Sequence, residues 1–79
     1  MKPTLGRIVI YTQPAAEAPV NGSREHPAII TRVWQPDSEV SGVNLQVFFD
    51  AGTPSPRTSV LHASRGSDQL GNWDWPKRD

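Results

Sequence analysis

The stretch Val43-Asn44-Leu45-Gln46-Val47-Phe48-Phe49-Asp50 decides the fold of this chain, because apolar residues recur in it with a period of two. Such an alternation is typical of a β-strand that buries one face and exposes the other. The residues at odd positions are therefore expected to point into a core: Val43, Leu45, Val47 and Phe49. The residues between them are expected on the opposite face.

Four further segments show the strand pattern less cleanly: Leu5 to Thr12, Ala28 to Gln35, Thr58 to Ala63 and Asn72 to Pro76. The second of them follows Pro27, which suits the start of a strand because proline has no N–H to offer the ladder. Residues that favour turns lie between these segments, and Asn21-Gly22 and Ser41-Gly42 are turn dipeptides. The stretch Gly52-Thr53-Pro54-Ser55-Pro56 is expected to interrupt the strands, since both of its prolines lack a ladder donor.

These five short strands, with Gly- and Pro-rich turns and no convincing helical stripe, predict an all-β fold, a small five-stranded SH3-like or OB-like barrel. With 79 residues, the chain is expected to form a single domain over residues 1–79. A domain of this size buries only about 60% of its unfolded surface and often needs an additional stabilising device. Because the chain has no cysteine and hence no disulfide, we expect it to form a homo-oligomer.

The charge balance narrows the classes of partner. Eight basic and eight acidic residues give a net charge of zero, which argues against a dedicated binder of duplex DNA or of anionic membranes. No apolar run is long enough to span a membrane, and the polar start Met1-Lys2-Pro3-Thr4 does not resemble a signal peptide. We therefore expect a soluble protein of the cytoplasm.

The residues needed for catalysis or metal binding do not form a recognised pattern. The chain has only two histidines, His26 before a proline and His62 within a predicted strand. It contains no nucleophile elbow, zinc-protease motif, dinucleotide fingerprint or P-loop. Two histidines without cysteine cannot complete a structural zinc site, and the scattered acidic residues do not form a calcium loop. We expect no enzymatic activity, no metal and no cofactor.

The aromatic residues carry the clearest indication of function. Three tryptophans in 79 residues is a high count, and Trp73-x-Trp75 places two rings on one face of a strand. Such a pair is either a stacking platform for the bases of a ligand or a plug that closes a small core. Trp34, at a predicted strand end, suits either ligand stacking or an oligomer interface. Tyr11 lies near the end of the first strand, where its hydroxyl reaches a ligand or solvent.

The basic residues favour an anionic ligand. Six arginines outnumber two lysines, and arginine binds phosphate oxygens through two parallel hydrogen bonds. Arg65 lies between Ser64 and Gly66-Ser67, in a loop whose backbone N–H groups are suited to hold a phosphate. His62 is either a hydrogen-bonded strand residue or a ligand contact. The candidate ligand-binding residues are Tyr11, Arg32, Trp34, Arg57, His62, Arg65, Trp73 and Trp75.

Four segments form a layout that covers nearly the whole chain apart from the loops at 13–26 and 51–57: KPTLGRIVIY (2–11), PAIITRV (27–33), VNLQVFFD (43–50) and GNWDWPKR (71–78). This layout resembles a family of small, mostly uncharacterised proteins of bacteriophages, prophages and actinobacteria, with the pattern GRIVxY…PAIVTxV…VxLxVF…GxWxWPxR. In that family the position between the two tryptophans is often histidine, whereas this chain has Asp74. The departure puts in doubt any contact that this position makes with an anionic ligand in relatives.

The resemblance implies a phage-encoded protein of the host cell cytoplasm. Small phage proteins without cysteine or catalytic residues include sponges that sequester nucleotide immune signals, such as cyclic oligonucleotides or ADP-ribose derivatives, and so evade anti-phage defence. A protein of this kind would stack tryptophans on bases and hold phosphates with Arg32, Arg57 and Arg65. Two alternatives remain. One is a structural or protein-interaction β-barrel, such as a minor virion or host-factor-binding module, and the other is a single-stranded nucleic-acid binder.

Overall fold

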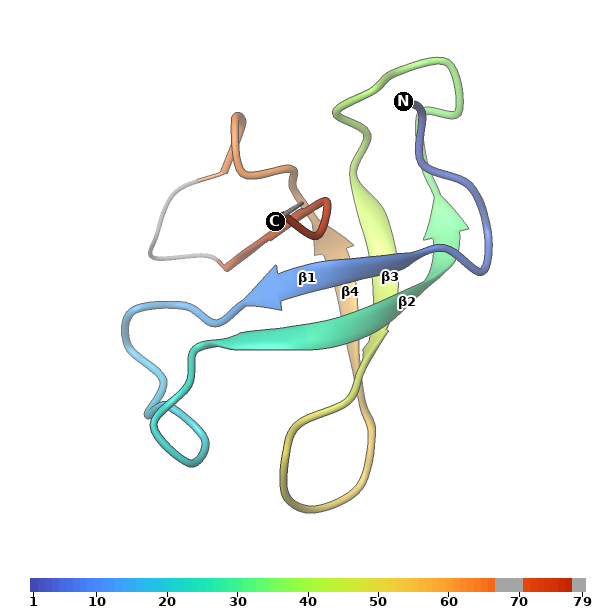
Figure 1. Ribbon diagram of the computed structural model, residues 1–79. Helices are drawn as coiled ribbons and strands as arrows, with labels where there is room; N and C mark the ends of the chain where they lie inside the picture. The colour runs from blue at the N-terminus through green and yellow to red at the C-terminus, as the bar shows by residue number, and fades with distance from the viewer. Residues whose placement is uncertain (67–70, 78–79) are drawn as a thin grey trace.

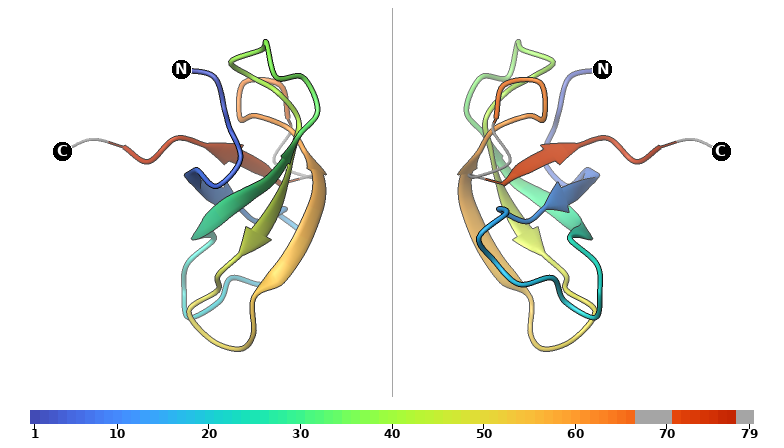
Figure 2. Two further views of the ribbon diagram at one scale, coloured as in Figure 1. Left: turned by 90° about the vertical axis from the view of Figure 1, so that its right-hand side faces the viewer. Right: turned by 90° about the vertical axis from the view of Figure 1, so that its left-hand side faces the viewer.

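The computed structural model describes residues 1–66 and 71–77 and contains one five-stranded antiparallel sheet (Figure 1). The strands are β1 Ile8–Thr12, β2 Glu25–Val33, β3 Val43–Val47, β4 Ser55–Val60 and β5 Asn72–Asp74. Their order across the sheet is β4-β3-β2-β1-β5, and the sheet curls into a half-barrel (Figure 2). The predicted all-β class with five strands is confirmed, and the described residues contain no helix.

The predicted inward face of β3 is confirmed. Val43, Leu45 and Val47 are at most 1% exposed. The strand ends at Val47 rather than at Asp50, because Val47 is the last residue that pairs with β4. Beyond that point Phe49 still packs against the core, whereas Phe48 lies on the outer face of the sheet.

Two prolines lie inside strands, contrary to the expectation from the sequence. β2 begins at Glu25 and includes Pro27, so its predicted start at Ala28 is wrong. The last pair between β2 and β3 is Ala28 with Val47, and the missing N–H of Pro27 therefore falls beyond the paired part of β3. Pro56 lies in β4, at the edge of the sheet, where a missing N–H interrupts no ladder on the open side.

Two other strand ends differ from the prediction for local reasons. β1 begins at Ile8 rather than Leu5 because the preceding residues form a turn. In this turn the Arg7 N–H donates to the Thr4 carbonyl at 3.3 Å, and Gly6 has φ +83°. β5 ends at Asp74, two residues before Pro76, which has no N–H for a ladder.

The segment after β4 closes the curl of the sheet. The predicted strand Thr58 to Ala63 divides in two, because Ser59 has φ +53° and β4 ends at Val60. The chain then pairs with β5. Trp73 donates its N–H to the Leu61 carbonyl at 3.1 Å, and its carbonyl accepts from the Ala63 N–H at 2.9 Å. The two ends of the sheet are thereby joined by a short parallel bridge.

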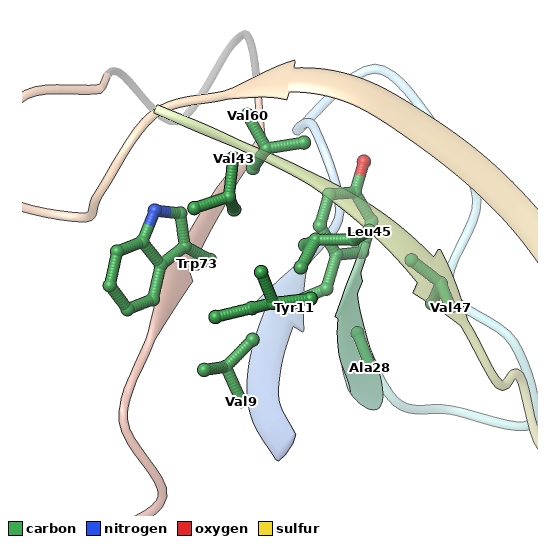
Figure 3. Packing of buried hydrophobic residues seen from close by; sticks show 9 residues of the cluster. Val9, Tyr11, Ala28, Val43, Leu45, Val47, Val60 and Trp73 are labelled. Atoms are coloured by element: carbon green, nitrogen blue, oxygen red, sulfur yellow. The ribbon is translucent and has the colours of Figure 1, made fainter. Parts of the chain in front are cut away.

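One apolar cluster fills the space that the curled sheet encloses (Figure 3). Its buried members are Val9, Tyr11, Ala28, Ile30, Val43, Leu45, Val47, Val60 and Trp73. Trp73 is the largest of the fully buried side chains, and its indole N–H donates to the Ser41 carbonyl at 2.9 Å. Of the two interpretations of this tryptophan, the core plug is correct.

Gly71 fits where no other residue does. Its φ is +75°, and a Cβ at this position would lie 2.9 Å from the Tyr11 hydroxyl oxygen and 3.1 Å from the Thr12 carbonyl oxygen. Gly52 has φ +86° but would place a Cβ in open space. Substitutions at Gly52 and Gly71 therefore distinguish the cost of backbone strain alone from the added cost of steric crowding.

We predict that Gly52→Ala lowers the free energy of unfolding by about 1–2 kcal/mol, the cost of a left-handed conformation for an L-residue. Gly71→Ala is expected to cost roughly 1–3 kcal/mol more, because the new methyl group must displace neighbours as well. Urea unfolding followed by tryptophan fluorescence measures both values. Equal losses for the two variants would contradict the packing around Gly71.

Buried polar side chains hold the long loop between β1 and β2. Gln13 and His26 are 5% and 2% exposed, and the Gln13 amide nitrogen donates to the Ala18 carbonyl at 3.2 Å. The Gln13 Oε1 therefore faces the His26 ring and accepts from its Nε2–H at 2.9 Å. Burial lowers the pKa of His26 below its ordinary value of 6.5, an effect that the nearby Asp50 carboxylate partly opposes.

This lowered pKa predicts a loss of stability in mild acid. As the pH falls below 6.5, the unfolded chain binds a proton at His26 more readily than the folded chain does, so the free energy of unfolding decreases. His26→Gln keeps an N–H donor for Gln13 but cannot titrate. Urea unfolding at pH 7.5 and pH 5.0 should show a larger decrease for the original chain than for the variant. An equal decrease in both would show that His26 does not contribute.

Candidate functional site

The predicted ligand-binding residues do not converge on one site. Tyr11 and Trp73 lie in the core, 2% and 0% exposed, so the expectation that either side chain reaches a ligand is corrected. Tyr11 occupies an inward position of β1 and Trp73 an inward position of β5. The two residues pair directly across these strands. The remaining candidates lie in four separate places.

Arg57 lies on the inner side of β4, where its guanidinium already contacts neighbouring polar and aromatic side chains. Its Nη2 is 3.5 Å from a Glu17 carboxylate oxygen, and its Nη1 donates to the Ser55 hydroxyl at 2.9 Å. Its Cζ lies 5.6 Å from the centre of the Phe49 ring and 5.9 Å from that of Tyr11. This arrangement fastens β4 to the loop after β1, and it does not favour the expected phosphate contact.

Arg32 and Trp34 lie together on the outer face of the sheet. A bulge between Ile30 and Arg32 shifts the register of β2, so that Arg32 pairs with Asn44, an outward residue of β3. The Arg32 guanidinium carbon lies 4.2 Å from the centre of the Trp34 ring, and the Trp34 indole N–H donates to Asn44. Trp34 is 45% exposed.

The loop that contains Arg65 does not offer a free set of backbone donors. The N–H groups of Arg65 and Gly66 both donate to the His62 carbonyl at 2.8 Å, and the Ser64 N–H donates to His62 Nδ1. The predicted phosphate-binding nest is therefore corrected as far as these residues are concerned, because its donors are already satisfied. Ser67 lies outside the described residues.

His62 is a hydrogen-bonded structural residue next to β5. Because its Nδ1 accepts from the Ser64 N–H, its Nε2 carries the hydrogen and donates to Asp74 Oδ1 at 3.1 Å. The same Asp74 oxygen accepts from the Trp75 N–H at 2.8 Å. The imidazole ring also packs edge-on against Trp73, with ring centres 4.8 Å apart. His62 and Asp74 thus fix the point at which Trp75 leaves the sheet.

Trp75 lines a groove beside β1, which we call the Trp75 groove. Its indole is half-buried and meets Trp73 at 5.5 Å with ring planes at 86°, so the two rings do not form a flat platform. The groove has a volume of about 540 Å³ and is lined by Met1, Gly6, Arg7, Ile8, Trp75, Pro76 and Lys77. In both views of Figure 2 residues 75–77 leave the sheet on the side where the N-terminal segment lies.

The lining of the Trp75 groove contains two cations and no acidic residue. The Arg7 guanidinium carbon lies 5.9 Å from the centre of the Trp75 ring. Among residues 1–66 and 71–77, no carboxylate lies at ion-pair distance from Arg7 or Lys77. An aromatic ring beside positively charged side chains suits a planar ligand that carries negative charge.

The sequence alone did not assign Arg7 and Lys77 to a site, although both line the Trp75 groove. The antiparallel pairing of β1 with β5, which includes Ile10 with Asp74, brings the segments that carry them to the same side of the sheet. The feature that would have indicated this site is the pairing of the first strand with the last. Without that pairing, the two cations are separated by most of the chain.

Neither a membrane-spanning helix nor a metal-binding cluster occurs in the described part of the chain. No helix there has the length and apolar character needed to cross a bilayer. No group of three or more histidine, aspartate or glutamate side chains within residues 1–66 and 71–77 is placed to hold a metal ion. Comparison of the chain with protein-family models, curated proteins and solved structures found no match.

Proposed function

We propose that this chain is a non-enzymatic binding protein that captures a nucleotide-type anion in the Trp75 groove. The observation that carries the proposal is the lining of that groove, which combines the partly exposed Trp75 indole with Arg7 and Lys77 and contains no acidic residue. Its volume of about 540 Å³ lies within the range of ordinary small-molecule sites.

Each part of the groove has a role in this proposal. A base stacks on the open face of Trp75, a contact worth about 1–3 kcal/mol in single-stranded nucleic-acid binders. Arg7 binds phosphate through its planar guanidinium, and Lys77 adds a second positive charge. The His62–Asp74 hydrogen bond positions the indole.

The biological role that fits such a binder is the one that the resemblance to phage proteins implies. We propose that the protein is phage-encoded and sequesters a cyclic oligonucleotide or an ADP-ribose derivative that serves as an immune signal in the host cytoplasm. Sequestration requires tight binding without turnover, and the Trp75 groove contains no histidine, serine or carboxylate in its lining. For the fold we propose the SH3-like alternative over the OB-like one. Its support is the strand order, an unbroken meander with β5 beside β1.

A protein-interaction barrel is the second candidate function. Its support is a set of exposed apolar side chains on and beside the outer face of the sheet: Leu5 at 69%, Ile8 at 59%, Trp34 at 45% and Phe48 at 38%. Isolated exposed apolar residues are ordinary, but neighbouring ones mark an interaction surface. A single-stranded nucleic-acid binder has less support, because it needs a continuous basic groove and the net charge is zero.

Thermal unfolding in the presence of nucleotides tests the proposed function. We expect one compound from a panel of cyclic dinucleotides, cyclic trinucleotides, cyclic ADP-ribose, ADP-ribose and ATP to raise Tm. At 100 times its Kd a ligand adds about 2.7 kcal/mol, which in so small a domain is a rise of roughly 10–20 °C. Chromatography of the recovered compound should show no turnover. A flat panel would contradict nucleotide capture, and a shift with a dT oligonucleotide alone would favour nucleic-acid binding.

Two variants locate the ligand. We expect Arg7→Gln and Trp75→Leu each to weaken binding of the active compound at least tenfold, as judged by titration calorimetry, because they remove the phosphate partner and the stacking face. Arg65→Gln makes the same change of charge outside the groove and serves as the control, with unchanged affinity. The reverse pattern, with affinity lost only in Arg65→Gln, would move the site to the loop after β4.

A further inference from the structure

The outer face of β1 and β2 carries an apolar stripe, which we define as Ile8, Ile10, Pro27, Ile29 and Phe48. The register places Ile8 beside Ile29 and Ile10 beside Pro27. Phe48 continues the second row, because its N–H donates to the Pro27 carbonyl at 2.9 Å. Ile8 is 59% and Phe48 38% exposed, Pro27 is exposed, and Ile10 and Ile29 are partly exposed, so the stripe runs from β1 across β2 to the residue after β3.

Opposite charges lie at the two ends of the apolar stripe. Glu25 begins β2 and Arg32 lies near its end, with the stripe between them. Glu25 pairs with Thr12 and shares the outward alternation of Pro27 and Ile29, while the bulge in β2 turns Arg32 to the same face. Within the described residues neither Glu25 nor Arg32 has an oppositely charged side chain at ion-pair distance.

We propose that the apolar stripe is the interface of a homodimer in which a second copy of the chain docks antiparallel to the first. A two-fold axis across the strands, near the middle of the stripe, places Arg32 of each copy opposite the partner's Glu25. The apolar rows then cover each other. An axis along the strands would instead bring Arg32 against the partner's Arg32, and like charges across an interface are strongly unfavourable.

The proposed interface does not rest on the proposed nucleotide binding, and it goes beyond the proposed function. It answers the need of a small, disulfide-free domain for additional burial of apolar surface. Ile8 belongs both to the stripe and to the lining of the Trp75 groove, so the second copy lies along one side of that groove.

Mass measurement in solution tests the dimer. Light scattering at micromolar concentration is expected to give twice the chain mass of 8.7 kDa for the original protein. Ile8→Lys should reduce the mass to that of one chain, and Thr58→Lys, an exposed position on the outer side of β4, should leave the dimer intact. Circular dichroism checks that both variants fold. A single-chain mass for the original protein, or an unchanged dimer in Ile8→Lys, would overturn the proposal.

A charge exchange tests the antiparallel arrangement and does not depend on removing apolar contacts. Glu25→Arg and Arg32→Glu are each expected to raise the dissociation constant of the dimer about tenfold or more at low salt, because each creates two like-charge contacts across the interface. The double variant should restore the original value. Additive weakening in the double variant would overturn the pairing of these residues. Because no nucleotide is present, failure here leaves the thermal-shift test of ligand capture unaffected.

Discussion

The buried Trp73 indole, with the backbone hydrogen bonds on either side of it, is the interaction on which the rest of the structure depends. Its strand residue pairs with Tyr11 of β1, and its N–H and carbonyl bond to Leu61 and Ala63 after β4. Its side-chain N–H reaches the Ser41 carbonyl before β3. One residue therefore joins both ends of the sheet and fills the space between them. A flat five-stranded sheet would leave this apolar face in water, and curling around Trp73 removes it from water.

Because the sheet curls around Trp73 and encloses the core, the side chains suited to bind a ligand lie outside the core. Trp75 is two residues away but outside β5, and the His62–Asp74 bond fixes its exit from the sheet. The positive charge of the Trp75 groove comes from Arg7 and Lys77, which flank the paired strands β1 and β5. Among the described residues, none that lines the groove carries a carboxylate. Zero net charge is thus compatible with a locally cationic groove.

The sequence was sufficient for the fold class but not for the site. The alternation at Val43 to Val47 was strong enough to predict a buried face, and the left-handed Asn21-Gly22 turn follows from residue chemistry alone. Pro27 was misread because its effect depends on where the neighbouring strand ends, which is a tertiary fact. Local pattern also left open whether Trp73 was a core residue. That Arg7 and Lys77 line one groove depends on the pairing of the first strand with the last, which local pattern does not reveal.

The most direct test of nucleotide capture is an NMR titration that follows the three indole N–H signals separately. Each tryptophan has a distinct environment: Trp73 bonded to Ser41 in the core, Trp34 bonded to Asn44 on the outer face, and Trp75 in the groove. With the compound that raises Tm, we expect the Trp75 signal to shift most, while the Trp73 and Trp34 signals move little. A dominant shift of Trp34, or no shift at Trp75 under saturating ligand, would contradict the proposed site.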